Sequence, residues 1–277
     1  MKLLRIFLFI LSAAAVLNLI SKTKIKTKKV VTEEIDIAPK NIFFDIGGVL
    51  FDTSKTAVMS KLGIIECMCN SDIENRSFEF MCFMDPEKSD ECATFKGRPL
   101  PSILCKWQKG KMTCHELCQK VQDCIAQNPN FFKNKTEKKL IKQISELVLP
   151  ENYLEITKPL YEGFKLAKEC KKLGHHIFIL SNYDPEHFEL LKEEYPKLFE
   201  IFDDKDIVLS GNIGIMKPNK KIFKYVINKY KLDPKDCIFI DDQEENLEAA
   251  SQAGWDEGIL YKKASTTRNK LRKRNIL

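Results

Sequence analysis

The chain has 277 residues, of which 44% are hydrophobic and only 22 are Gly or Pro, so it can bury a sizeable core and is not collagen-like, repeat-built or wholly disordered. Its formal net charge is +6, but residues 1–30 and 262–277 contain fourteen of the 45 basic residues and no acidic residue. The remainder has 31 basic and 39 acidic residues, a net charge of −8, which argues against a basic body that binds an acidic partner.

Residues 3–20 form an apolar run that is interrupted only by Arg5, Ser12 and Asn18. The run predicts either a secretory signal peptide or a short membrane anchor over residues 1–20, followed by a basic, polar linker over 21–39. A cleaved signal would make the protein secreted or periplasmic, and an uncleaved segment would anchor it to the membrane. If the lysines of the linker obey the positive-inside rule, the anchored protein would instead face the cytoplasm.

The first predicted strand begins the segment NIFFDIGGVLFDT, residues 41–53, and runs into a glycine-rich turn. In the last third of the chain, apolar strands alternate with amphipathic helices. Strands are predicted at 176–180, 206–210, 237–241 and 258–261, and helices at 159–174, 186–195, 219–231 and 244–254. This alternation predicts an α/β fold, with a Rossmann-like parallel sheet built from residues 40–54 and 156–262.

Residues 55–155 do not follow the alternation and predict a mainly helical cap domain, with helices near 113–126 and 136–148. An insert at the carboxyl end of a strand lies over the crevice in which open α/β sheets bind ligands. The cap contains eight of the ten cysteines: Cys67, Cys69, Cys82, Cys92, Cys105, Cys114, Cys118 and Cys124. Behind an export signal this set favours a disulfide framework, and the alternatives are buried reduced thiols or a zinc site.

Residues 263–277 form a basic tail in which no aromatic residue is interleaved. This composition predicts a solvated tail, and no nucleic-acid partner is expected. The only macromolecular contact that the sequence suggests is membrane attachment through residues 3–20.

Polar residues stand at the ends of the predicted strands or in the loop before a helix, namely Asp45, Ser181, Lys217, Asp241 and Asp242. Because parallel strands point the same way, these side chains are expected to converge at one edge of the sheet.

The sequence resembles the haloacid dehalogenase (HAD) superfamily in four segments: FFDIGGVLFDT (43–53), IFILSNYD (177–184), VLSGNIGIMKPNKKIF (208–223) and FIDDQEENLEAASQAG (239–254). The resemblance is to the phosphatase-like branch with a helical cap inserted after the first motif. It implies that Asp45 is a nucleophile that forms an aspartyl-phosphate, which water then hydrolyses. It also implies Mg²⁺ as the cofactor, held by Asp45, the Gly47 carbonyl and Asp242, with Asp241 beside it.

By the same resemblance, Lys217 and Ser181 are expected to act in catalysis and to bind the phosphoryl group, and Asn182 is expected to help bind it through its amide. The implied function is a phosphoric monoester hydrolase that acts on a small phosphorylated metabolite of the sugar-phosphate type.

Gly47 departs from the family pattern, because most family phosphatases carry an acid–base Asp two residues after the nucleophile. General acid–base help is commonly worth about 10²–10⁴-fold in rate. One alternative is therefore a catalytically impaired binding protein with this fold. A less favoured alternative is a 2-haloacid dehalogenase, whose chemistry needs no metal.

Overall fold

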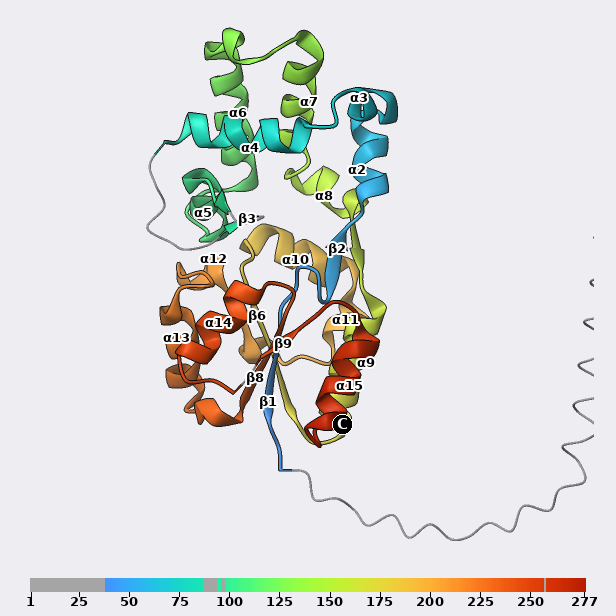
Figure 1. Ribbon diagram of the computed structural model, residues 1–277, viewed down its shortest axis with the longest axis vertical. Helices are drawn as coiled ribbons and strands as arrows, with labels where there is room; N and C mark the ends of the chain where they lie inside the picture. The colour runs from blue at the N-terminus through green and yellow to red at the C-terminus, as the bar shows by residue number, and fades with distance from the viewer. Residues whose placement is uncertain (1–37, 87–93, 96–97, 257) are drawn as a thin grey trace, which may run out of the picture. The chain divides into compact units, whose positions relative to one another are not determined.

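The computed structural model describes residues 38–86, 94–95, 98–256 and 258–277. Five parallel strands form the central sheet in the order β7-β6-β1-β8-β9 (Figure 1). They are β1 (Asn41–Phe44), β6 (His176–Ser181), β7 (Ile207–Leu209), β8 (Cys237–Asp241) and β9 (Ile259–Leu260). The predicted parallel α/β sheet is confirmed, and all five strands lie where short apolar segments were expected.

Alternate residues of β1 enter two separate hydrophobic clusters, because successive strand side chains point to opposite faces. Ile42 and Phe44 pack in the cluster that includes helices α9, α10 and α15, whereas Phe43 packs with α13 and α14. The helices of this core are α9 (Tyr161–Lys172), α10 (Pro185–Glu194), α11 (Pro196–Phe199), α12 (Ser210–Ile213), α13 (Lys220–Tyr230), α14 (Glu244–Gln252) and α15 (Ala264–Lys273). Short 3₁₀ turns complete it at Asp204–Asp206 and Pro234–Asp236. Helices therefore cover both faces, as a buried parallel sheet requires.

The helical insert begins and ends at an antiparallel pair of short strands, β2 (Phe51–Thr53) and β5 (Thr157–Pro159). Between them lie α2 (Lys55–Leu62), α3 (Ile64–Cys69), α4 (Ile73–Met84), α5 (Ser102–Gln108), α6 (Cys114–Gln127), α7 (Lys135–Glu146) and α8 (Pro150–Ile156). A 3₁₀ turn at Pro129–Phe131 and the strand pair β3 (Thr94–Phe95) and β4 (Arg98–Pro99) lie in the same insert. The insert has a hydrophobic core of its own around Phe80, Leu117 and Ile141, which agrees with the expected helical cap.

The C-terminal segment differs from the predicted solvated tail. Residues 264–273 form helix α15, which buries Ala264, Thr267 and Leu271 along one face. Lys270, Arg272 and Lys273 are exposed, and the half-buried Arg268 pairs with Glu169 of α9. The prediction was wrong because it considered the charges alone and not the helical spacing of these three residues.

The expected disulfide framework is not found among the nine cysteines that the structure describes, all of which are free thiols. Several of them fill core positions and contact other groups, so they are not directed at one another. For example, the Cys118 thiol lies near Ser145 and Gln122, and the Cys237 thiol donates to the Asp233 carbonyl. Buried free cysteine commonly behaves as a small hydrophobic residue. Cys92 lies outside the described residues.

The predicted signal or anchor, residues 3–20, also lies outside the described residues. Within the part of the chain that the structure covers, no helix combines the length and the hydropathy needed to cross a bilayer.

Candidate active site

The carboxyl ends of three adjacent strands bring the predicted acidic and hydroxyl side chains together. Strands β6 and β8 flank β1, so that Phe44 lies beside Ile179 on one side and Ile240 on the other. Asp45 follows β1 directly, while Ser181 and Asp241 are the last residues of β6 and β8. Neighbouring parallel strands that end at the same level place these three side chains at one edge of the sheet.

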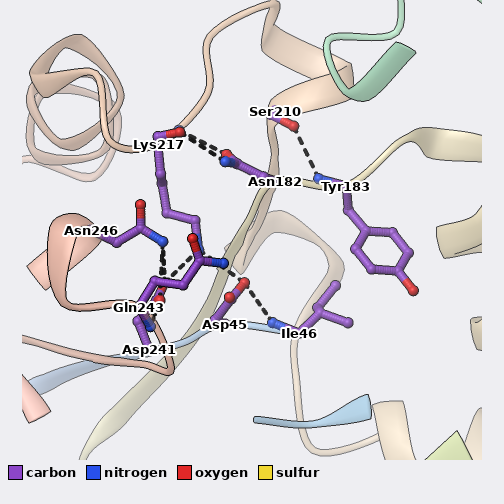
Figure 2. Close-up of polar contacts among 9 residues, drawn as sticks. All are labelled: Asp45, Ile46, Asn182, Tyr183, Ser210, Lys217, Asp241, Gln243 and Asn246. Carbon is purple, nitrogen blue, oxygen red and sulfur yellow. Dashed lines mark hydrogen bonds and ion pairs between the residues drawn. The ribbon is translucent and has the colours of Figure 1, made fainter. Parts of the chain in front are cut away.

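Lys217 links two of these carboxylates from the loop before α13 (Figure 2). Its Nζ lies 2.9 Å from Asp45 Oδ1 and 2.6 Å from Asp241 Oδ2. The lysine is only 1% exposed, and the two aspartates are 4% and 0% exposed. A buried ammonium group needs such partners, because a charge without them is strongly destabilising inside a protein.

Two residues that the sequence interpretation missed hold Asp241 in place. The Asn246 amide donates to both Asp241 oxygens, at 3.0 and 3.1 Å, and the Gln243 backbone N–H donates to Oδ1 at 2.8 Å (Figure 2). Both residues lie at the start of α14, directly after the acidic pair. The position of Gln243 directly after the acidic pair was an available signal, whereas the local sequence does not indicate which way the Asn246 side chain points.

Asn182 has a different set of contacts from the one expected of a phosphate ligand. Its amide N–H donates to the Lys217 carbonyl at 2.8 Å, and its carbonyl oxygen accepts the Lys217 backbone N–H at 2.7 Å (Figure 2). Asn182 lines the same cavity as Ser181 and Lys217. Its two hydrogen bonds nevertheless fix the backbone from which the lysine side chain extends.

The pKa of Asp45 is raised to about 7, chiefly by burial and also by the negative charge of Asp241, against the opposing effects of Lys217 and Ser181. Desolvation raises the pKa of Asp242 to about 6, with Asp241 again adding to the shift. Burial alone would lower the pKa of Lys217, but Asp241 and Asp45 outweigh it and the pKa is raised. One lysine therefore does not neutralise this group of carboxylates, and a further cation would favour their charged forms.

Asp45, Asp241 and Asp242 each offer a carboxylate oxygen, and these three atoms lie within 4.8 Å of one another. The backbone at Gly48 permits this approach, since its φ is +68° and a Cβ there would lie 2.5 Å from Asp242 Oδ2. Gly47 is different, because a Cβ at that position would meet no atom within 4 Å. The three carboxylates form an oxygen-rich set of the kind that hard divalent cations prefer.

A cavity of about 260 Å³ lies beside Asp45 and Lys217. It is lined by the core residues Asp45, Gly47, Ser181, Asn182, Tyr183, Met216, Lys217, Gln243, Glu245 and Asn246, and by Thr94, Leu100 and Gln108 from the insert. Asp52 pairs with Lys158 in the β2–β5 ladder and is not among the residues that line the cavity.

Hydrogen bonds join the insert to the core at residues that line the cavity. The Ser210 hydroxyl donates to the Gln108 carbonyl at 2.6 Å and accepts the Tyr183 backbone N–H at 3.0 Å. Glu245 accepts two hydrogen bonds from Thr94, one from its backbone and one from its hydroxyl. A ligand in this cavity would therefore touch both parts of the chain.

A family model for haloacid dehalogenase-like hydrolases matches residues 39–254, which include every strand and loop that supplies the site. The chain belongs to this hydrolase family. The family suggested by the four sequence motifs is thereby confirmed, and so is the classification of the protein as a hydrolase.

Two similar proteins are named for different phosphate compounds. The D-ribitol-5-phosphate phosphatase of Bacteroides thetaiotaomicron is 27% identical over 234 residues, which cover 78% of this chain and 89% of that protein. The chloroplast flavin mononucleotide hydrolase of Arabidopsis thaliana is 26% identical over 156 residues, or 46% and 63% of the two chains. Against the bifunctional epoxide hydrolase 2 of Rattus norvegicus, the match spans only 20% of the length of that relative.

Solved structures of HAD-like proteins share the fold. A family enzyme from B. thetaiotaomicron is 21% identical with a TM-score of 0.54, and the match covers 82% of this chain and 95% of that one. The same enzyme has been crystallised as a complex with magnesium and inorganic phosphate. A HAD-like hydrolase from Porphyromonas gingivalis is 18% identical with a TM-score of 0.53, covering 86% and 99% of the two chains.

Proposed function

We propose that this protein is a Mg²⁺-dependent phosphatase that hydrolyses a small phosphorylated metabolite of the sugar-phosphate type. The observation that carries the proposal is the buried Asp45–Lys217–Asp241 arrangement, of which Asp45 and Lys217 line a cavity of about 260 Å³. The cavity lies below the range of about 300–1,000 Å³ that is usual for sites of drug-sized ligands. Its size and its amide and hydroxyl lining favour a compact, hydroxylated substrate.

Asp45 is the nucleophile in this proposal. Its Oδ1 is held by the Lys217 ammonium group at 2.9 Å and by the Ile46 N–H at 2.8 Å. We assign the attack on phosphorus to Oδ2, which forms an aspartyl-phosphate as the bond from phosphorus to the leaving oxygen breaks. Water then attacks this intermediate, so that inorganic phosphate leaves and the Asp45 carboxylate is restored.

Lys217 and Ser181 stabilise the charge on the phosphoryl group. Both line the cavity beside Asp45, and both are almost fully buried, so that their interactions are weakly screened by water. Asn182, Asn246 and Gln243 act as positioning residues, the first on the Lys217 backbone and the other two on Asp241.

The carboxylates present fit a Mg²⁺ ion. Asp45 and Asp242 would hold it together with the Gly47 carbonyl, and Asp241 would lie beside it. Gly48 supports this fit, since a side chain there would displace the Asp242 carboxylate. When bound, the ion would offset the negative charge of the phosphoryl group and of its carboxylate neighbours.

The test is phosphate release from a panel of sugar and polyol monophosphates by the purified protein with Mg²⁺. Asp45→Asn is the matched control, because it removes the nucleophile and keeps the side-chain size. We expect turnover of at least one member of the panel, lost in the variant and in EDTA. Full activity in Asp45→Asn would contradict the proposal, and no activity on any member would favour an inactive binding protein.

A further inference from the structure

A second polar cluster lies where the helical insert meets the core, and the proposed phosphatase chemistry does not use it. It consists of Cys114, the first residue of α6, and of Asp184 and His187 at the start of α10. These residues are 0%, 3% and 1% exposed. A thiol, a carboxylate and an imidazole thus meet in a buried position, with the thiol coming from the insert and the other two groups from the core.

Two separations between these side chains match those of ligands around one metal ion. Cys114 Sγ lies 3.5 Å from His187 Nε2 and 3.8 Å from Asp184 Oδ1. Around a tetrahedral Zn²⁺ ion, metal–sulfur and metal–nitrogen bonds of about 2.3 and 2.0 Å put the ligand atoms about 3.5 Å apart. Each of the three residues offers one ligand atom within 4.8 Å of the other two, so that the side chains could turn toward a shared ion.

Neighbouring groups hold the imidazole of His187 in place. Tyr153 stacks on the ring at 3.6 Å between centroids, and Trp107 contacts it edge-on. Nε2 lies 2.8 Å from the Val148 carbonyl oxygen and 3.5 Å from the Cys114 thiol, and Asp184 Oδ2 lies 3.0 Å from Nδ1. An ion bound at Nε2 would replace the proton that this nitrogen donates to the Val148 carbonyl.

The charges around the cluster also favour a cation. Glu186 Oε2 accepts the Cys114 backbone N–H at 2.7 Å, so that two carboxylates, Glu186 and Asp184, lie close to the thiol. Burial raises the pKa of Cys114 far above its usual value, and both carboxylates add to the shift. Metal binding would release the thiol proton to solvent and place positive charge between these acidic groups.

We propose that Cys114 Sγ, His187 Nε2 and Asp184 Oδ1 form a binding site for a Zn²⁺-type divalent cation, distinct from the carboxylate site at Asp45. Sulfur and imidazole ligands select borderline ions such as Zn²⁺ and Co²⁺ over Mg²⁺. Water or the Val148 carbonyl, 2.8 Å from Nε2, would fill the fourth position. Because the ligands come from both α6 and α10, the bound ion would fasten the insert to the core.

Co²⁺ is the probe for this site, since its bond to a thiolate gives a charge-transfer absorption band. The full-length protein is titrated with Co²⁺ in excess Mg²⁺, which occupies the carboxylate site. We expect the band to appear and to be displaced by Zn²⁺. In Cys114→Ala the band is lost, and in His187→Gln the affinity falls at least about tenfold.

Two controls separate this site from other effects. Cys118→Ala removes another buried thiol one turn further along α6, and it should keep the band and the affinity within about twofold. Asp242→Asn alters the carboxylate site and should also keep the band. Absence of the band in the wild type, or the same band in Cys114→Ala, would overturn the proposal. A Zn²⁺-dependent rise in Tm that is lost in His187→Gln supplies a second readout, and neither readout depends on phosphatase activity.

Discussion

Gly47 is the residue at which this chain departs from most phosphatases of its family, and the structure shows that the position can accept a side chain. A Cβ built there meets no atom within 4 Å, and the residue lines the cavity beside Asp45. An acid at this point could protonate the leaving oxygen, which no group in the proposed mechanism does.

We predict that Gly47→Asp raises kcat, and that the gain is larger for alkyl phosphates than for an aryl phosphate with a good leaving group. General acid–base catalysis is worth about 10²–10⁴-fold, and we expect at least about tenfold for an alkyl phosphate. Steady-state kinetics on the two substrates measure the difference.

Gly48→Asp is the matched control for this gain. The same side chain at Gly48 would enter a backbone with φ +68° and approach Asp242, so it should lower activity and Mg²⁺ affinity. An equal kcat for Gly47→Asp and wild type on both substrates would show that the missing acid does not limit the rate.

At the scale of elements, the basic C-terminal segment folds as helix α15 and packs against the core. Leu271 is fully buried in the cluster that also holds residues of β1 and α9, and Lys270 beside it is exposed. We predict that Leu271→Ala lowers the free energy of unfolding by about 2–5 kcal/mol, as large-to-small core substitutions do. Chemical denaturation measures this loss.

The control is Lys270→Ala, which should change the free energy of unfolding by less than about 0.5 kcal/mol, as exposed substitutions usually do. Equal stability of Leu271→Ala and wild type would mean that α15 is not part of the cooperative core.

The elements with strong local patterns were predictable from the sequence, and those that depend on packing were less so. The apolar runs of β1, β6 and β8 are short and bounded by turns, and Pro218 and Gly254 mark where α13 begins and where α14 has ended. The role of Asn246 was not predictable, because an amide in a polar helix turn has the same local sequence whether it faces Asp241 or solvent. Asn182 lines the cavity together with Ser181 and Lys217, but its bonds to Lys217 were not predictable, because they depend on a loop 35 residues away.

At the scale of the whole molecule, the active-site carboxylates should make metal-free stability depend on pH. The folded pKa of Asp45 is about 7, against an ordinary value of 3.8. Between these values the folded state binds more protons than the unfolded state, so this carboxyl group favours folding at low pH and loses that effect as pH rises through 7.

We predict that in EDTA the free energy of unfolding of the wild type, relative to Asp45→Asn, falls by more than about 1.4 kcal/mol between pH 5 and pH 8. Denaturation of both proteins at the two pH values measures it. Saturating Mg²⁺ should reduce the fall, because the ion favours the charged carboxylates. A relative stability that rises with pH in EDTA would contradict the proposed protonation of Asp45.

The antiparallel pair β2–β5 has a consequence for how the chain folds. Strands β1 and β6 are neighbours in the sheet although more than 130 residues separate their first residues, and closing a loop of that length costs about 4 kcal/mol of chain entropy. Pairing of Phe51–Thr53 with Thr157–Pro159 brings the two ends of the helical insert together. Once the insert has collapsed around its own core, only the short stretches from β1 to β2 and from β5 to β6 remain to be ordered. The folding rate of the sheet should therefore depend on residues of the insert that never touch it.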